Sequence, residues 1–396
     1  MSSQAPLPLD GITVISVEHA VAAPFATRQL ADLGARVIKV ERPDGGDFTR
    51  RYDETVSGES SYFVWLNRSK ESLTLDLKTA PGRAMIEQLL GTADVFVHNL
   101  GPGAAERMDL DATSVAERHP RVIVATISGY GTSGSASGRK AYDLLVQAET
   151  GLLSLTGTRD APAKVGISIA DIAAGMYAYS GILTALLYRA TTGRVNSVEV
   201  SLFDALAEWM GAPLYYTYHG GKQPDRVGAE HATIAPYGPF DTADGSVLLA
   251  IQNEREWANF CQTVLDQPQL TDDARFAHNS ARVAHRVECN TIIAERLETL
   301  TSEETLQLLD KAAVASARMN SIVEFMAHPA LAERHRWREV DTAAGPIRAL
   351  LPPATLPDVP IALGPVPSLG EHNTPILTEL GYTAHQITNL QAARVI

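Results

Sequence analysis

Short runs of β-favouring residues alternate with helical patterns through the first third of this chain. The strand-like runs are Ile12–Glu18, Arg36–Glu41, Val95–Asn99 and Val122–Ser128, with helical patterns over Pro24–Leu33 and Gly82–Ala93. Alternation of this kind is typical of βαβ units, which build a parallel sheet. Ligands bind beyond the carboxyl ends of such strands, and the residues at or near those ends are Glu18, Glu41, Asn99 and Ser128. We therefore predict an α/β fold with a binding site along that edge.

The remainder of the chain predicts a second structural unit. Helical patterns cover Tyr142–Tyr188, with an interruption at Leu155–Ser168, and most of Trp257–Lys311. After Tyr216 repeated glycines and prolines indicate a linker. The tail from Pro352 reads as a loop until a last helix near Asn373–Leu380. At 396 residues the chain is long enough for two domains.

The formal net charge of −13 argues against nucleic acid or an anionic membrane as a partner, because both reward clusters of Lys and Arg. A local basic pocket can still bind an anionic ligand. The two cysteines, Cys261 and Cys289, lack metal-type spacing and fit a reducing compartment. No signal peptide is apparent in Met1–Asp10, and the apolar stretch Ile169–Tyr188 contains Asp171 and lacks basic flanks. We therefore expect a buried helix there and a cytoplasmic protein.

The turn after the first strand argues against a dinucleotide cofactor. An NAD site of the Rossmann type needs glycines in that turn so that the backbone can approach a pyrophosphate. The stretch His19–Pro24 contains none, although Glu41 occupies the usual place of a ribose-binding acid. Pro24 is predicted at the first position of the following helix. No metal site is predicted, because none of the 11 histidines has a ligand spacing, and no GxSxG elbow supports a serine hydrolase.

Asp171 is the residue whose surroundings invite a chemical interpretation. It follows an apolar run and precedes a strongly apolar helix that begins with Ile172. One interpretation is an N-cap, whose carboxylate accepts hydrogen bonds from the helix N–H groups. The other is a partly desolvated carboxylate that acts as a nucleophile. The residues alone leave both interpretations open.

Six segments spread over nearly the whole chain carry a family resemblance. They are Leu9–Arg50, LNRSKESLTLDLK (Leu66–Lys78), ADVFVHNLGPG (Ala93–Gly103), RKAYDLLVQAETGLLSLTG (Arg139–Gly157), DIAAGMYAYSGILTALLYRATTGR (Asp171–Arg194) and PSLGEHN (Pro367–Asn373). As an ordered set they resemble the class III CoA-transferase family, which includes formyl-CoA transferase and carnitine CoA-transferase. Two further segments, Gly228–Phe240 and Arg336–Ile347, resemble the branch that acts on small dicarboxylates such as succinate, malate, citramalate, itaconate and mesaconate.

The resemblance implies an enzyme that moves coenzyme A between carboxylic acids. Asp171 matches the family's nucleophile, which attacks the donor thioester to form a mixed anhydride and then an aspartyl-CoA thioester. The acceptor carboxylate attacks that thioester, and splitting one exchange into easier steps is the gain of covalent catalysis. CoA esters are the substrates, and no permanently bound cofactor is implied.

The matching motifs also imply residues that contact the substrates. The residues implied for CoA are Ala20, Arg42, Lys70, Asn99, Leu100, Arg107 and Lys140. Those implied for the thioester and the acid are His19, Val21, Tyr142 and His231. Formyl-CoA transferase-like enzymes carry Gln at the position of Val21, so here we expect backbone N–H groups of this turn to stabilise the oxyanion. His231 is the residue expected to recognise the distal carboxylate.

The family also contains α-methylacyl-CoA racemase, whose base is a histidine at the position of Tyr142. A phenol is a poor base at neutral pH, so the sequence favours transfer over epimerisation. A protein that binds CoA esters without turnover is the other alternative, and Asp171 argues against it. The family fold implies a Rossmann-like large domain from residues 1–220 and 321–396 and a smaller α+β domain from residues 221–320. It also implies an interlocked homodimer.

Overall fold

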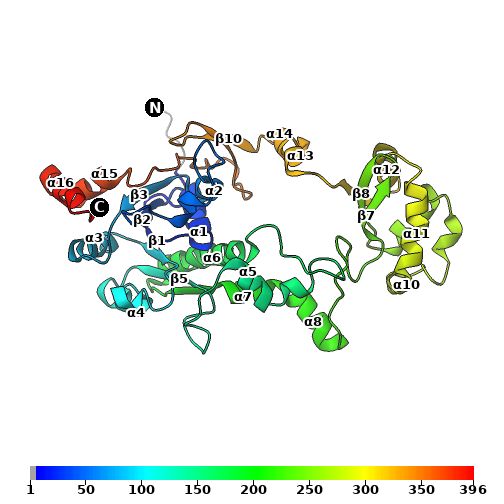
Figure 1. The fold of residues 1–396 in the computed structure, drawn as a ribbon, viewed down its shortest axis with the longest axis horizontal. Coiled ribbons are helices and arrows are strands. Elements are labelled where there is room, and N and C mark those ends of the chain that lie inside the picture. The colour runs from blue at the N-terminus through cyan, green and yellow to red at the C-terminus, as the bar shows by residue number, and fades with distance from the viewer. Residues whose placement is uncertain (1–5) are drawn as a thin grey trace. The chain divides into compact units, whose positions relative to one another are not determined.

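The computed structural model describes residues 6–396 and divides into two compact units, whose elements are labelled in Figure 1. The first unit contains the described residues up to Thr150, together with Val165–Met210 and Glu333–Ile396. The second unit contains Gly151–Lys164 and Gly211–Ala332. Each unit is described by itself.

A six-stranded parallel sheet in the order β3-β2-β1-β4-β5-β6 forms the centre of the first unit. Its strands are β1 (Thr13–Val17), β2 (Arg36–Glu41), β3 (Lys70–Thr74), β4 (Val95–His98), β5 (Ile123–Ser128) and β6 (Val198–Ser201). The predicted α/β fold and parallel sheet are confirmed. The chain reverses direction of travel across the sheet between β1 and β4, and ligands of such sheets bind beside that switch point.

The two edge strands, β3 and β6, were not predicted from the sequence. They read KESLT and VEVS, which are short and contain charged residues instead of a continuous apolar run. The edge of β3 is covered by the segment that follows Pro367. His372 Nδ1 accepts the Ser72 N–H at 3.2 Å, and Asn373 Oδ1 accepts the Thr74 N–H at 2.8 Å. This contact gives the PSLGEHN segment a structural role at an edge that would otherwise expose unpaired backbone groups.

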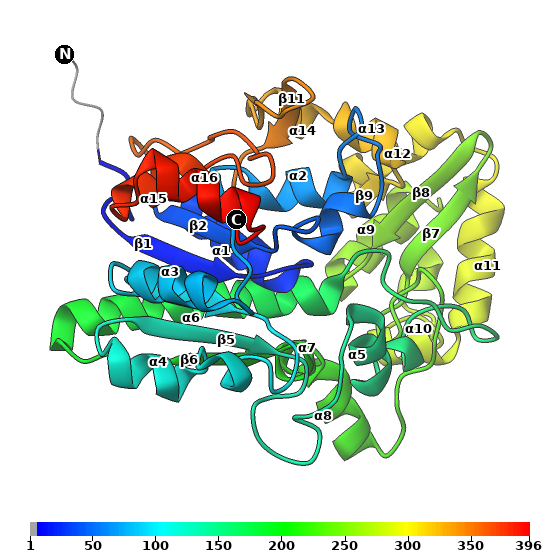
Figure 2. The same ribbon diagram turned by 60° about the vertical axis from the view of Figure 1, so that its left-hand side comes forward.

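Helices cover both faces of the sheet. On one face, α3 (Ala80–Leu90), α4 (Ala112–Arg118), α15 (Asn373–Glu379) and α16 (Ala384–Ala392) enclose an apolar core with alternate side chains of the strands. On the other face lie α1 (Ala22–Asp32) and the long helix α6 (Ile169–Thr192), which contact each other along their lengths (Figure 2). Helix α16 is an addition to the prediction, which ended at the helix near residue 373. Pro24 is the third residue of α1, so its predicted first position is wrong.

Helix α6 is long and apolar enough to cross a membrane by length and composition. It instead packs against α1, α5 (Asp143–Glu149), α7 (Leu202–Trp209) and strand β5 inside the first unit. Gly175 shows how close this packing is, because a Cβ added there would lie 2.7 Å from the Ala22 carbonyl oxygen. We therefore interpret α6 as a core helix, in agreement with the sequence.

The second unit is built around an antiparallel sheet of β7 (Tyr237–Thr242), β8 (Gly245–Ala250) and β9 (Ala315–Arg318). Its helices include α8 (Gly211–Gly220), α9 (Glu254–Thr263), α10 (Asn279–Ala284), α11 (Arg286–Leu297), α12 (Ser302–Lys311), α13 (Ile322–Met326) and α14 (Pro329–Ala332). Trp257, Phe260 and Phe276 form the centre of its core. Cys261 and Cys289 belong to the same core as free, buried thiols.

Candidate active site

A cavity of about 270 Å³ opens at the carboxyl ends of β1, β2 and β4. It is lined by His19 and Glu18 after β1, by Arg42, Asp47 and Phe48 after β2, and by Leu100 after β4. Three residues implied by the family resemblance, His19, Arg42 and Leu100, therefore lie around one cavity. Its position agrees with the predicted edge of the sheet.

Buried ion pairs form the floor of this region. The Lys39 ammonium lies 2.9 Å from Asp47 and 3.5 Å from Glu18. The Lys70 ammonium lies 2.8 Å from Glu18 and also donates to the Pro24 carbonyl. Burial by itself raises the pKa values of Glu18 and Asp47. The charges of Lys70 and Lys39 outweigh burial for Glu18, Lys39 and the Thr49 hydrogen bonds do so for Asp47, and both pKa values lie below the usual range.

Lys70 differs in placement from the other residues implied for CoA. Its side chain is fully buried, and burial lowers its pKa to about 8 in spite of the Glu18 charge. The ammonium is not among the groups that line the cavity. A direct contact between Lys70 and CoA stays a prediction.

The turn that connects β1 to α1 is held by side chains from two other loops. Asn99 accepts the His19 N–H at 3.0 Å and donates to the His19 carbonyl at 2.7 Å. Asp47 accepts the Ala20 N–H at 3.3 Å. Ala20 has a φ of 63°, a left-handed conformation that residues other than glycine adopt at a cost. Two of the N–H groups expected to be available for an oxyanion are therefore already occupied, and among the described residues nothing accepts the Val21 N–H.

Asp171 is the third residue of α6 and does not cap it. Ser168 occupies the N-cap position, so the N-cap interpretation of Asp171 is wrong. The first turn of α6 is capped instead by Asp143, the first residue of α5. Its carboxylate accepts the N–H of Ala170 at 2.7 Å and that of Asp171 at 3.5 Å, while Gln147 donates to its other oxygen at 2.7 Å.

The Asp171 carboxylate has no cation beside it. Within residues 6–396 its oxygens form no hydrogen bond and no ion pair. Burial raises the pKa of Asp171 to about 7, and the nearby negative charge of Asp143 adds to the rise. The carboxyl group therefore changes charge near neutral pH, unlike the buried carboxylates below the β1–α1 turn.

Aromatic rings lie beside the β1–α1 turn. Phe48 contacts His19 at a centroid distance of 5.0 Å and Tyr52 at 5.7 Å. Burial raises the pKa of Tyr52 to about 12, and the charges of Asp47 and Asp171 contribute to the rise. Tyr142, directly before α5, is 65% exposed and also interacts with the Tyr52 phenol. Sequence reasoning missed Tyr52, because an isolated tyrosine in a loop carries no spacing signal.

The comparisons with known proteins agree with this geometry. The family model described as CoA-transferase family III matches residues 9–373. The chain belongs to CoA-transferase family III. It is an enzyme of the CoA-transferase type, and the racemase alternative is not favoured.

Two relatives and one solved structure illustrate the similarity to other family III transferases. Succinate–glutarate CoA-transferase of Agrobacterium fabrum is 34% identical over 94% of this chain and 96% of its own. Succinyl-CoA:mesaconate CoA-transferase of Haloarcula hispanica is 31% identical over 94% of this chain and 96% of its own. The crystal structure of a CAIB/BAIF family protein from Brucella suis matches with a TM-score of 0.83 and 32% identity, covering 95% of this chain and all of that one.

Arg107, Lys140 and His231 are among the residues implied for substrates that do not line the cavity of this family III transferase. Arg107 and Lys140 are exposed in the first unit, and their charged ends form no hydrogen bond or ion pair with described residues. His231 is an exposed residue of the second unit. Its ring stacks on Tyr237 at a centroid distance of 5.3 Å, and its Nδ1 accepts the Thr233 N–H at 3.2 Å.

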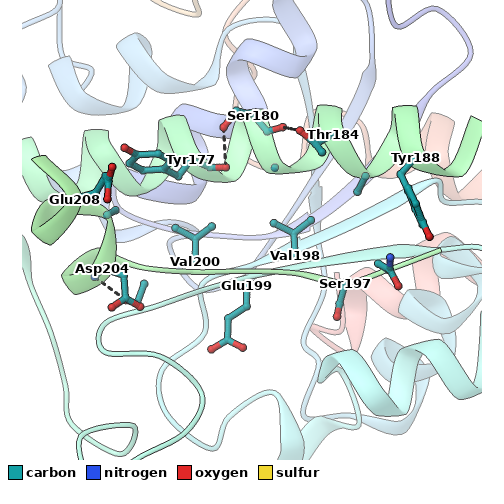
Figure 3. A pocket seen from close by; sticks show the side chains of 15 residues that line it. Tyr177, Ser180, Thr184, Tyr188, Ser197, Val198, Glu199, Val200, Asp204 and Glu208 are labelled. Carbon is teal, nitrogen blue, oxygen red and sulfur yellow. Dashed lines mark hydrogen bonds between the residues drawn. The ribbon is translucent and has the colours of Figure 1, made fainter. Parts of the chain in front are cut away.

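A larger cavity of about 750 Å³ lies between helix α6 and the edge strand β6 (Figure 3). Tyr177 and Tyr188 of α6 line one side of it, and Val198 and Val200 of β6 point toward that helix while Glu199 points away (Figure 3). Asp171 is not part of its lining. In the described part of the transferase, no group of three or more His, Cys, Asp or Glu side chains is arranged to hold a metal ion.

Proposed function

We propose that this transferase moves CoA from succinyl-CoA or a similar donor to a small dicarboxylic acid through covalent intermediates on Asp171. The observation that carries the proposal is the Asp171 carboxylate itself. It is partly buried, has no cation or hydrogen-bond donor among residues 6–396, and lies at the start of a helix whose first turn is capped by Asp143. A carboxylate that is neither paired nor used for capping is free to attack.

The proposed reaction has four exchanges at acyl carbon. An ionised oxygen of Asp171 attacks the thioester carbonyl, a C–O bond forms, and the C–S bond breaks with release of the CoA thiolate. The thiolate then attacks the aspartyl carbonyl of the mixed anhydride, which releases the donor acid and leaves an aspartyl-CoA thioester. The acceptor carboxylate attacks that thioester, and the thiolate finally attacks the acceptor's carbonyl in the new anhydride, which regenerates the Asp171 carboxylate. The apolar start of α6 limits the access of water to these intermediates.

The cavity beside the β1–α1 turn is the proposed site for part of CoA. Arg42 offers a positive charge there, Leu100 offers an apolar surface, and Asn99 fixes the turn. Arg107 and Lys140 have free charges that suit the phosphates of CoA. We propose that Lys70 acts indirectly, by neutralising Glu18 beneath the turn.

The acceptor is proposed from the relatives' names and not from a contact. The relatives reported above are named for glutarate and mesaconate, so dicarboxylates of four to six carbons are the acids to test. His19, Val21 and Tyr142 are proposed to contact the acyl group, and His231 the distal carboxylate. The first unit is proposed as the CoA-binding large domain and the second as the small domain.

We also propose a cytoplasmic homodimer. Large apolar side chains remain exposed on the single chain, among them Leu187 and Tyr218, which are 65% and 80% exposed. A partner subunit would cover such residues. Analytical ultracentrifugation measures the assembly directly, and a sedimentation coefficient of a 42.5 kDa monomer would contradict it.

The test of the function is a transfer assay with succinyl-CoA and a panel of C4 to C6 dicarboxylates, in which new CoA esters are identified by mass. Asp171→Ala should abolish transfer and retain CoA-ester binding. A control is Asp204→Ala, which removes an α7 carboxylate that bonds Ser201, far from the capped turn of α6 in sequence. Equal turnover by wild type and Asp171→Ala would contradict the mechanism.

A further inference from the structure

Side chains form hydrogen bonds with the backbone groups of residues 18–20 in the β1–α1 turn. Lys39 donates to the Glu18 carbonyl at 3.3 Å. Asn99 accepts the His19 N–H and donates to the His19 carbonyl, and Asp47 accepts the Ala20 N–H. The next N–H, that of Val21, has no acceptor among the described residues, nor do those of Ala22 and Ala23 in the first turn of α1, and Val21 is only 3% exposed. N–H groups at a helix start have no partner inside the helix, and that of Val21 is the one among them that belongs to the turn expected to bind the oxyanion.

The free N–H lies at the end of α1 that faces the candidate nucleophile. Gly175 packs on the Ala22 carbonyl so closely that no Cβ fits between them. Asp171 is one helical turn before Gly175 on the same face of α6, so its carboxylate borders the start of α1. Burial and the charges of Asp47 and Asp171 raise the pKa of the Tyr52 phenol.

We propose that Asp47 is a positioning residue for the transfer reaction. By accepting the Ala20 N–H it holds Ala20 in the left-handed conformation, and this conformation leaves the Val21 N–H free to donate to the oxyanion that forms when Asp171 attacks a thioester. This inference rests on the proposed function. It narrows the oxyanion donor expected from the turn to a single N–H, because His19 and Ala20 donate to side chains.

The ion pair with Lys39 explains why an acid does this task. Asp47 uses one oxygen for the Ala20 and Thr49 N–H groups and the other for Lys39. The ammonium therefore keeps the carboxylate ionised and fixed in orientation under the turn. An asparagine at position 47 has nearly the shape of aspartate and keeps one acceptor oxygen, but it carries no charge. Mutation can therefore separate the hydrogen bond to Ala20 from the ion pair with Lys39.

The test compares Lys39→Met/Asp47→Asn with Lys39→Met/Asp47→Leu. Both lack the ion pair and have the same side-chain size at position 47, but only the Asn variant retains an acceptor for Ala20. We expect the Asn variant to keep kcat within about threefold of wild type and the Leu variant to lose about 10²-fold, with KM for the CoA ester changed little in both. Hydrogen exchange of the peptide containing residues 18–22 should be faster in the Leu variant.

A second pair of variants keeps the inference testable if the Leu variant does not fold. Ala20→Gly adopts a positive φ without strain, whereas Ala20→Val resists that conformation, so kcat should be at least 30-fold higher for the Gly variant than for the Val variant at similar KM. Equal kcat for the Asn and Leu variants, or for Ala20→Gly and Ala20→Val, overturns the role of Asp47. Absence of transfer by the wild-type protein would instead overturn the proposed function and this role with it.

Discussion

Two groups of carboxylates at the carboxyl edge of one sheet have opposite surroundings. Below the β1–α1 turn, Glu18 and Asp47 are fully buried with Lys39 and Lys70, and the lysine charges hold the pKa values of both acids low. At the start of α6, the charge that acts on Asp171 is that of another acid, Asp143, and burial raises the pKa of Asp171 to about 7.

Burial acts in the same direction on both groups, so the neighbouring charge decides the outcome. A buried carboxylate with a cation stays ionised and becomes a rigid hydrogen-bond acceptor, as Asp47 is for Ala20. A partly buried carboxylate without a cation gains basicity and keeps its oxygens free. The first arrangement suits positioning and the second suits a nucleophile.

The largest expected effect comes from replacing the unpaired acid. Asp171→Asn should lower kcat by about 10⁴-fold or more, because an amide oxygen cannot form the anhydride. The same variant should unfold at higher denaturant than wild type. A carboxyl whose pKa is raised on folding stabilises the fold below its unfolded pKa and loses that stabilisation as pH rises through the folded value, about 7.

Chemical denaturation at pH 5 and pH 8 separates these two effects. The advantage of Asp171→Asn over wild type should be about 1–2 kcal/mol larger at pH 8, a figure reduced for the partial exposure of the side chain. An equal advantage at both pH values would mean that Asp171 is not destabilised when ionised.

The second expected effect is on stability at the paired acids. Lys39→Ala removes the cation shared by Glu18 and Asp47 and leaves buried charge without a partner, so unfolding should become easier by about 3–5 kcal/mol. Arg118→Ala is a matched control, because its ion pair with Glu87 is solvent-exposed and should contribute less than about 1 kcal/mol. Urea denaturation of both variants measures the difference, and similar losses would refute the distinction.

The sequence does not predict the paired group, whereas it does single out Asp171 as a candidate nucleophile. Glu18 and Glu41 stand at strand ends by pattern, but the sequence does not say that Lys39 and Lys70, from neighbouring strands, reach under the turn. In strand β2 the alternation of side chains would by itself predict that Lys39 faces solvent. Helix α1 covers that face of the strand, so Lys39 is buried. Such contacts depend on strand order, which periodicity does not supply.

The motif was enough to select Asp171 as a candidate, but the sequence did not predict which residues surround it. The sequence offered it as a cap, yet the cap comes from Asp143 on a separate helix, 28 positions earlier. A cap supplied across a loop leaves no local signature of the kind that Ser or Asp before a helix gives. The central strands followed from their apolar runs, whereas the polar edge strands β3 and β6 did not.

A smaller effect should appear in the pH dependence of transfer. Activity of the free enzyme should rise with pH through about 7 as Asp171 ionises. Asp143→Asn keeps an acceptor for the Ala170 N–H and removes the neighbouring negative charge, so the midpoint of the kcat/KM profile should move to lower pH by about one unit. An unchanged midpoint would show that burial alone raises the pKa of Asp171.

The smallest expected effect concerns the Tyr52 phenol, whose pKa is affected by both Asp47 and Asp171. Tyr52 has a pKa of about 12, so its hydroxyl stays protonated at neutral pH and can donate to a bound carboxylate. Tyr52→Phe should raise KM for the acceptor acid about three- to tenfold with kcat nearly unchanged, which corresponds to the typical net contribution of one hydrogen bond. Tyr62→Phe is the matched control, since its ring contacts Tyr52 edge-on at 5.5 Å. If both variants raise KM equally, the effect comes from packing of the aromatic rings. The Tyr52 hydroxyl then makes no separate contribution to binding of the acceptor acid.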